Sequence, residues 1–274
     1  MPTTWVFNFD ERAADWFHDM IMVAVLSARE RTDLSPLCLF DGKGTPPIIS
    51  WLKANGVPVV RTQVPFRDEL FSEAVIAANA GTAYHPQHAS GAFLRLMAPD
   101  FVEAPYFLYT DCDVMFLNNP VQSFLNPRII AACAEIYVDN IVVETSDFFN
   151  SGVMFLNRAG FLAERERMIE LLRANRFYFQ EYCSYDQTMM NLALGDRWER
   201  LPSELNWRPF QGINPHASIV HFHGPKPHRI GSILDGEASA CEAPEAARFA
   251  QHHENEYRHY VELFRRYLSR TALV

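Results

Sequence analysis

The stretch FLYTDCDVMFL, residues 107–117, ends an apolar run with two carboxylates. Asp111 and Asp113 follow Tyr106–Thr110, which predicts a strand covered on both faces. Removing a carboxylate from water is unfavourable unless it is paired or bound to a cation. Because ligands of open α/β sheets bind beyond the carboxyl ends of the strands, the two aspartates are candidate ligands of Mg²⁺ or Mn²⁺. The alternative is that one aspartate caps a turn while the other faces solvent.

Strands and helices alternate around this stretch. Apolar runs predict strands at Trp5–Phe9, Pro36–Phe40, Val57–Thr62, Tyr106–Thr110, Ile129–Cys133, Gly152–Leu156 and Ile219–Phe222. Helices are predicted at Ala13–Ala28, Pro47–Ala54, Arg67–Ala78, Ser90–Ala98, Gly160–Asn175 and Ser184–Leu194. This order indicates βαβ units, so the expected fold class is α/β with a mostly parallel central sheet flanked by helices.

A C-terminal extension is expected after the main domain, which we assign to residues 1–230; residues 231–274 then form a linker and a helix. Residues 231–244 are rich in small and acidic residues, and Ala246–Leu268 carries apolar side chains at steps of three and four. Four arginines lie in the last turns of this amphipathic helix: Arg258, Arg265, Arg266 and Arg270. The helix either packs on the main domain or contacts an anionic membrane surface.

The composition excludes some classes of protein. The 274 residues are 49% hydrophobic and carry a formal net charge of −9 without a dense run of lysine and arginine, so no nucleic-acid partner is expected. The five cysteines form no CxxC pair, which argues against a disulfide framework or a cysteine-based zinc site. No signal peptide is evident at the N-terminus, so we expect a cytoplasmic protein.

A second polar block, IVHFHGPKPH at residues 219–228, has the form of a strand followed by a turn. His221 stands at the end of this strand, and a neutral imidazole there could complete a metal site with Asp111 and Asp113. Lys226 follows the turn and could approach phosphate oxygens as a point charge. The chain has ten histidines, so a histidine without a metal is the competing interpretation.

Five blocks stand in a fixed order: FLRLMAP (93–99), FLYTDCDVMFL (107–117), FFNSGVMFLN (148–157), SYDQTMMN (184–191) and HFHGPKP (221–227). Together they resemble glycosyltransferase family 8, whose members have the GT-A fold and transfer sugars with retention of anomeric configuration. The resemblance covers residues 1–230 and is strongest between Ser90 and Pro227. It implies a GT-A nucleotide-sugar glycosyltransferase domain over residues 1–230.

The resemblance also implies roles for individual residues. Asp111, Asp113 and His221 would bind Mn²⁺ or Mg²⁺, and Asp186 and Gln187 would lie near the anomeric carbon as the catalytic pair. The donor would be bound by Asn8, Phe9, Asp10, Arg95, Asp111, Cys112, Asp113, Asn150, Ser151, Gly224 and Lys226. For Asp186, Asn150 and Arg95 the alternatives are a helix N-terminal acid, a turn residue and a surface ion pair.

The implied activity is the metal-dependent transfer of a sugar from a nucleotide-diphosphate sugar, expected to be a UDP-sugar, to a glycan or another hydroxyl acceptor. A divalent ion and Lys226 would stabilise the departing diphosphate, and Asp186 and Gln187 would stabilise an oxocarbenium-like carbon. The sequence leaves open whether a protein nucleophile takes part. A polysaccharide or lipid-linked glycan as the acceptor is what the resemblance implies. Peripheral contact with the inner face of a membrane is instead suggested by the basic, aromatic C-terminal helix.

Departures from the family pattern identify a divergent member. The nucleotide-binding start reads FNFDERAADW and lacks the tyrosine usual in the family, and Lys226-Pro227-His228 stands where the family ends its last block with tryptophan. Two alternatives therefore remain, a non-catalytic homologue that binds sugar nucleotides and a phosphohydrolase with a DxD site. The phosphohydrolase is less favoured because its DxD follows the first strand of the domain.

Overall fold

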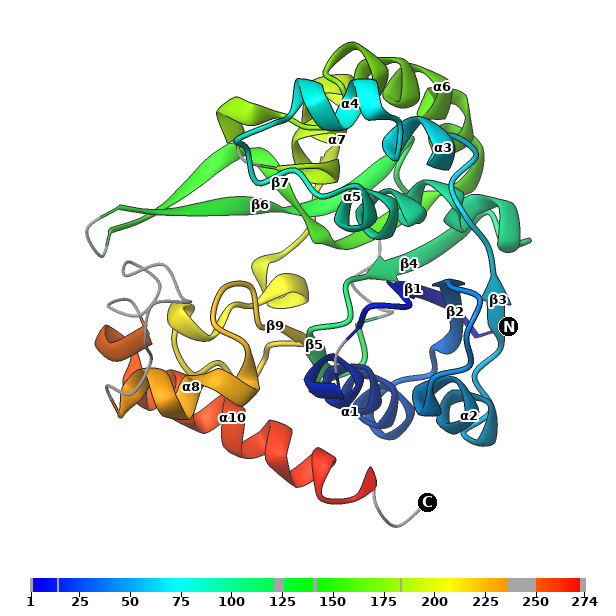
Figure 1. Ribbon diagram of the computed structural model, residues 1–274. Helices are drawn as coiled ribbons and strands as arrows, with labels where there is room; N and C mark the ends of the chain where they lie inside the picture. Colours follow the sequence, from blue (N-terminus) through cyan, green and yellow to red (C-terminus); the bar gives the residue numbers. More distant parts are fainter. Residues whose placement is uncertain are drawn as a thin grey trace.

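A seven-stranded sheet forms the centre of the computed structural model, which describes residues 2–13, 15–120, 126–139, 142–182, 184–235 and 250–271. The strand order is β3-β2-β1-β4-β7-β6-β8 (Figure 1). The strands are β1 Thr4–Asp10, β2 Ser35–Asp41, β3 Val59–Arg61, β4 Tyr106–Thr110, β6 Ile130–Asp139, β7 Val142–Asn157 and β8 Glu199–Arg200. Among these strands β7 alone runs antiparallel to its neighbours, so the predicted mostly parallel α/β sheet is confirmed.

Both faces of this sheet are covered by helices (Figure 1). Along β1, Trp5 and Phe7 point into one core and Val6 into the other, because side chains alternate across a strand. The first core contains α1 Asp15–Arg31 and α2 Pro47–Ala54, and the second contains α5 Pro86–Phe93, α6 Arg158–Ala174 and α7 Asp186–Leu194. Burial on both faces explains why the strands read as continuous apolar runs.

A second, two-stranded sheet lies beside the central one. It pairs β5 Val114–Phe116 with β9 Ile219–His221 in antiparallel register, and Val114 stands opposite His221. The sequence predicts β9 but not β5, since β5 is only three residues long and follows the aspartates directly. This pairing brings the DxD block and the histidine-containing block of the sequence to one place.

The C-terminal helix α10, Glu254–Leu268, packs on the main domain. Tyr257, Tyr260 and Phe264 are buried in a third core, which they share with Met20 of α1 and with Phe222. Helix α8, Pro227–Leu234, contributes to the same core. Of the two readings of the C-terminal helix, packing on the domain is therefore the one that the structure shows for its aromatic face. Membrane contact through the charged face stays a prediction.

Two predicted helices have a different form. The single helix expected at Arg67–Ala78 is two, α3 Arg67–Leu70 and α4 Glu73–Ala78, because the Ser72 hydroxyl accepts a hydrogen bond from the backbone of Val75 and begins a new helix. The helix expected at Ser90–Ala98 is α5 followed by a 3-10 helix, η1 Leu94–Phe101. Pro99, which was expected to follow the helix, lies inside η1.

The strand predictions were also partly wrong. The runs at Ile129–Cys133 and Gly152–Leu156 belong to the much longer paired strands β6 and β7, and β3 is shorter than Val57–Thr62. The expected loop at 231–244 is wrong for residues 231–234, which continue α8. Residues 236–249 lie outside the described part of the chain, so the start of the helix expected at Ala246 lies outside it too. The proposed domain boundary after residue 230 falls inside α8, and the division into two units stays a prediction.

None of the described helices combines the length and the apolar character that crossing a bilayer requires. The three described cysteines, Cys38, Cys112 and Cys133, are buried and unpaired. The other two, Cys183 and Cys241, lie outside the described residues.

The packing of α10 can be tested with Phe264→Ala. The ring is 4% exposed and makes an edge contact with Phe222, with ring centroids 5.7 Å apart. We expect its removal to lower the free energy of unfolding by about 3–5 kcal/mol, as for other buried aromatic residues, in chemical denaturation. Glu262→Ala on the exposed face is the control. Equal stability of the two variants would show that α10 is not part of the core.

Candidate active site

The residues predicted to bind a metal lie together at the carboxyl end of β4. The backbone N–H of Phe222 donates to the carbonyl of Asp113 over 2.9 Å, which fixes β9 beside the turn that follows β4. Nε2 of His221 lies 3.3 Å from Oδ1 of Asp113. One ligand atom each of Asp111, Asp113 and His221 lies within 4.8 Å of the others. The DxD pair and a histidine from a distant part of the chain thus form one cluster.

The orientation of His221 suits a cation. Nδ1 is 2.9 Å from Oδ1 of Asn206, an oxygen that can only accept, so Nδ1 carries a proton. In the neutral imidazole, Nε2 then presents its lone pair to Asp113. A lone pair that faces a carboxylate oxygen is unfavourable unless a cation lies between them. The cluster therefore fits a divalent ion such as Mn²⁺ or Mg²⁺, held by two carboxylates and an imidazole.

Gly152 is required beside this imidazole. A Cβ atom at this position would lie 2.2 Å from Cε1 of His221. The backbone carbonyl of Gly152 also accepts from the N–H of Asp111 over 2.8 Å, which aligns β7 with the end of β4. Steric conflict with His221 thus explains why the FFNSGVMFLN block has a glycine at this position.

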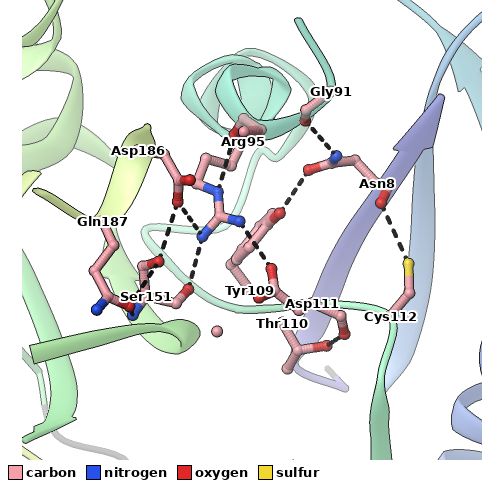
Figure 2. Close-up of polar contacts among 12 residues, drawn as sticks. Asn8, Gly91, Arg95, Tyr109, Thr110, Asp111, Cys112, Ser151, Asp186 and Gln187 are labelled. Atoms are coloured by element: carbon pink, nitrogen blue, oxygen red, sulfur yellow. Dashed lines mark hydrogen bonds and ion pairs between the residues drawn. The ribbon is translucent and has the colours of Figure 1, made fainter. Parts of the chain in front are cut away.

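Arg95 is the centre of the polar contacts in Figure 2. It lies in η1, is 6% exposed, and donates to Oδ1 of Asp111 and to the carbonyl of Ser151 over 2.8 Å each. One of its terminal nitrogens also lies 2.9 Å from Oδ2 of Asp186. Burial disfavours the charged guanidinium, but Asp186, Tyr109 and Asp111 prevail and raise the pKa of Arg95. The alternative of a surface ion pair is therefore wrong, since this arginine bridges two carboxylates in the interior.

The residues expected near the sugar come from β7 and from the start of α7. Oδ2 of Asp186, the first residue of α7, accepts from the Ser151 hydroxyl over 3.0 Å (Figure 2). Oε1 of Gln187 accepts from the backbone N–H of Ser151 over 3.0 Å and from Nδ2 of Asn150 over 3.2 Å. The four residues therefore form one connected group behind Arg95.

Lys226 supplies a cation on the other side of the DxD turn. Its ammonium donates to Oδ2 of Asp113 and, over 3.0 Å, to the carbonyl of Phe222. Gly224 has a φ of 102°, a conformation that favours glycine, and so turns the chain between β9 and α8. Burial disfavours ionisation of Asp113, but the neighbouring ammonium of Lys226 is the strongest opposing charge, and the pKa of this carboxyl lies well below its usual range. For Asp111, burial prevails over Arg95 and raises the pKa.

A cavity of about 400 Å³ opens beside these charges. Its lining includes the predicted donor-binding residues Asn8, Phe9, Asp10, Arg95, Asp111, Cys112, Asp113 and Lys226. Of the other predicted residues, Asn150, Ser151, Asp186, Gln187, His221 and Gly224 are not part of this lining. The structure therefore brings both aspartates and the residues predicted to bind the nucleotide to one cavity, with His221 in contact with Asp113 behind it. The group predicted to lie near the sugar is linked to this cavity through Arg95.

The first residues of the cavity are already hydrogen-bonded within the protein. Asn8 donates to the carbonyl of Gly91 over 3.0 Å and accepts from the hydroxyl of Tyr109 (Figure 2). The Cys112 thiol is buried and donates to the carbonyl of Asn8 over 3.2 Å. Burial raises the pKa of this thiol well above its usual range, so Cys112 is a neutral filler between the two aspartates.

Several residues of the site were not found from the sequence. Arg12, Trp16 and His88 line the cavity, and Trp16 stacks on His228 with ring centroids 4.4 Å apart. Glu135 and Arg208 form a buried ion pair behind Asn150. A signal was present for Glu135, because a carboxylate inside the apolar run of β6 needs a partner. Nothing local indicated that the partner is Arg208.

The sequence pattern of glycosyl transferase family 8 matches residues 46–228 of the chain. The chain belongs to this family. The predicted resemblance is thus confirmed, and the DxD pair, the NSG block and the HFHGPKP block all fall within the matched residues.

Individual relatives agree with this assignment. "Probable glycosyl transferase Gly" of Streptococcus gordonii is 25% identical over 143 residues, which are 47% of this chain and 20% of that protein. The glycosyltransferase GlyE of Streptococcus pneumoniae TIGR4 has a TM-score of 0.57 at 16% identity over 98% of this chain and 64% of its own. An active-site mutant of LgtC has a TM-score of 0.58 at 17% identity, over 90% of this chain and 94% of its own.

These similarities confirm the expected fold. At 16% and 17% identity, GlyE and LgtC show that the architecture is that of GT-A glycosyltransferases. The chain spans a fifth of the length of the S. gordonii relative and 64% of GlyE.

The steric role of Gly152 is testable with Gly152→Ala. The imidazole of His221 is held by Asn206, so the added methyl group displaces it from the cluster. We expect the affinity for Mn²⁺, measured by isothermal titration calorimetry, to fall at least about tenfold. Gly231→Ala is the control, because its methyl group meets no atom closer than 3.8 Å. Unchanged Mn²⁺ affinity in folded Gly152→Ala protein would contradict the assignment of His221.

Proposed function

We propose that this chain is a metal-dependent glycosyltransferase that moves a sugar from a nucleotide-diphosphate sugar to a hydroxyl acceptor, with retention of anomeric configuration. One observation carries the proposal: Asp111 and Asp113, which form a cluster with His221, line a cavity that is also lined by Arg95 and Lys226. Cation ligands and protein cations at one cavity match a diphosphate, which needs both. Membership of glycosyltransferase family 8 supports the reaction class.

A divalent ion on these ligands would act as a Lewis acid and neutralise charge on the leaving diphosphate. Lys226 would bind the diphosphate as a second counter-charge, since its ammonium lies at the same carboxylate, Asp113. Arg95 holds Asp111 in place and orients Asp186 through its second ion pair. Because these groups are fixed before the donor arrives, little reorganisation is needed during the reaction.

The sugar is proposed to lie beside Asp186 and Gln187. Asp186 accepts from Arg95 and from Ser151, and an oxygen at this place would stabilise positive charge on the anomeric carbon. Asn150 and Ser151 would line the sugar, and Gly224 and Lys226 the diphosphate. Retention is carried over from the family, and attack by the acceptor on the face of the leaving group needs no protein nucleophile.

Mn²⁺ as the ion, UDP as the nucleotide and a glycan or lipid-linked glycan as the acceptor are the further parts of the proposal. LgtC has been crystallised with donor and acceptor sugar analogs, which supports a sugar acceptor here. We further propose a cytoplasmic location and contact of the charged face of α10 with a membrane. The non-catalytic alternative is less favoured because the cluster and both flanking cations are present together.

The proposal predicts a thermal shift. Mn²⁺ with UDP-sugar should raise the melting temperature, since a ligand at 100 times its Kd stabilises the native state by about 2.7 kcal/mol. Asp113→Asn should abolish the shift, whereas Asp68→Asn, on the exposed surface of α3, should retain it. GDP- and dTDP-sugars in the same assay identify the nucleotide. The absence of a shift with every sugar nucleotide, with and without Mn²⁺, would contradict the proposal.

A second experiment distinguishes the role of Lys226 from that of the metal ligands. Lys226→Met removes a cation that competes for Asp113, so Mn²⁺ should bind at least as tightly as in the unmodified protein. The affinity for UDP in the presence of Mn²⁺ should fall about 10- to 100-fold, as expected when a charged hydrogen bond is lost. Lys53→Met, on the exposed side of α2, is the matched control. Weaker Mn²⁺ binding with unchanged UDP binding would contradict this role, because Lys226 would then support the metal site and not the diphosphate.

A further inference from the structure

Behind the sugar-side group lies a buried ion pair that the proposed reaction does not use directly. Glu135 of β6 is 4% exposed and Arg208 is 1% exposed, and the guanidinium lies 3.2 Å from Oε1 of the carboxylate. Register shifts in the pairing of β6 with β7, between Ala132 and Ala134 and between Ala134 and Ile136, accompany the buried position of Glu135. Neither residue lines the cavity of the active site.

An ion pair at this depth needs an explanation other than stability. Desolvation of two charges offsets most of their attraction, and apolar residues of similar volume are often as stable. The pair occupies space in which the fold could place two hydrophobic side chains. Its value therefore lies in the hydrogen bonds that the charge enforces.

The carboxylate of Glu135 accepts hydrogen bonds at both oxygens. Oε1 accepts from Arg208 and from the backbone of Ile136, and Oε2 accepts from Nδ2 of Asn150 over 2.8 Å and from Nε2 of Gln187 over 2.7 Å. An ionised carboxylate can only accept, so both amides must turn their nitrogen toward Glu135. Their oxygens consequently face the other way, that of Gln187 toward Ser151.

The series of hydrogen bonds continues from Asn150 to the metal cluster. Because Oδ1 of Asn150 faces away from Glu135, it accepts from Nδ2 of Asn206 over 2.9 Å. Asn206 then has its oxygen toward His221, whose Nδ1 lies 2.9 Å away. Oδ1 of Asn150 also accepts from the backbone N–H of Gly152 over 3.1 Å, so Glu135 and this backbone donor favour the same amide orientation. The last bond of the series puts a proton of His221 on Nδ1.

We propose that the Arg208–Glu135 ion pair is a positioning element, which orients the amides of Gln187 and Asn150 and, through Asn206, presents Nε2 of His221 to the cation. The metal-binding consequence rests on the proposed function, whereas the orientation of the amides and the tautomer of His221 do not. One buried charge thus aligns the sugar side and the metal side of the site. Glu135 and Arg208 are positioning residues that touch neither ligand.

The test uses Glu135→Gln and the double variant Glu135→Gln/Arg208→Met. The glutamine keeps the volume but replaces one carboxylate oxygen with an N–H₂ group, so it can no longer accept both from the two amides and from Ile136 and Arg208. The double variant removes the unpaired arginine charge, and it keeps the test valid where the single variant unfolds. Leu172→Ala, in the core at α6, is the control for lost stability without a change in the hydrogen-bond chain.

Two measurements distinguish positioning from simple support of the fold. Long-range ¹H–¹⁵N spectra of the metal-free protein report the tautomer of His221, assigned with His221→Gln. We expect the Nδ1-protonated form in the unmodified protein and in Leu172→Ala, and a mixture of tautomers in the Glu135 variants. Calorimetric titration with Mn²⁺ alone should show an affinity about 10- to 100-fold weaker in the Glu135 variants and no change in Leu172→Ala.

The outcomes separate the two proposals. An unchanged tautomer and unchanged Mn²⁺ affinity in a folded Glu135 variant would overturn the positioning role. An equal loss of Mn²⁺ affinity in Leu172→Ala would overturn it as well, because stability alone would then explain the effect. If the unmodified protein binds no Mn²⁺, the metal-dependent function fails, while the spectra still decide whether Glu135 sets the tautomer.

Discussion

Buried negative charge is the constraint on which the site depends. Four carboxylates lie close to one sheet edge, and each ionised group needs a cation or several donors. Arg95 serves both Asp111 and Asp186, Lys226 serves Asp113, and Arg208 serves Glu135. Removing any one of these cations would leave at least one carboxylate without its ion-pair partner. The protein cations therefore hold the site in shape before a ligand binds.

These cations come from segments far apart in the chain, so the fold must bring them together. Arg95 lies in η1, Lys226 precedes α8, and Arg208 lies between two short 3-10 helices, η4 Ser203–Asn206 and η5 Pro209–Gln211. The small sheet of β5 and β9 connects the DxD turn to the segment that carries His221 and Lys226. The third core fixes that segment from behind, because α8 and α10 pack on α1. The C-terminal helix thus contributes to the geometry of the active site without touching it.

The local sequence pattern was sufficient to predict part of this arrangement but not the rest. Trp5–Phe9 and Tyr106–Thr110 read correctly as strands because strands buried on both faces are apolar throughout. Asp111, Asp113 and His221 were found because their residue types at strand ends suit a cation. The Glu135–Arg208 pair could not be found, since two residues 73 apart meet only through the tertiary structure. The division of Arg67–Ala78 into two helices depends on one serine cap, which periodicity does not register.

Two of the departures from the family pattern lie together, because Trp16 in the first stacks on His228 in the second. At one end of the site, around the Asp111–Asp113–His221 cluster, hydrogen bonds link Glu135, Asn150, Asn206 and His221 in series. At the other end Asp10 is engaged by Arg12, and the exposed Trp16 stacks on His228, which stands in the place of the usual tryptophan. A residue whose polar atoms already form hydrogen bonds or ion pairs within the protein contributes less to recognition of a base than one whose polar atoms face the cavity unpaired. Under the proposed function, charge therefore constrains the end of the site that would hold the metal and the diphosphate, and the altered residues lie at the end that would hold the nucleobase.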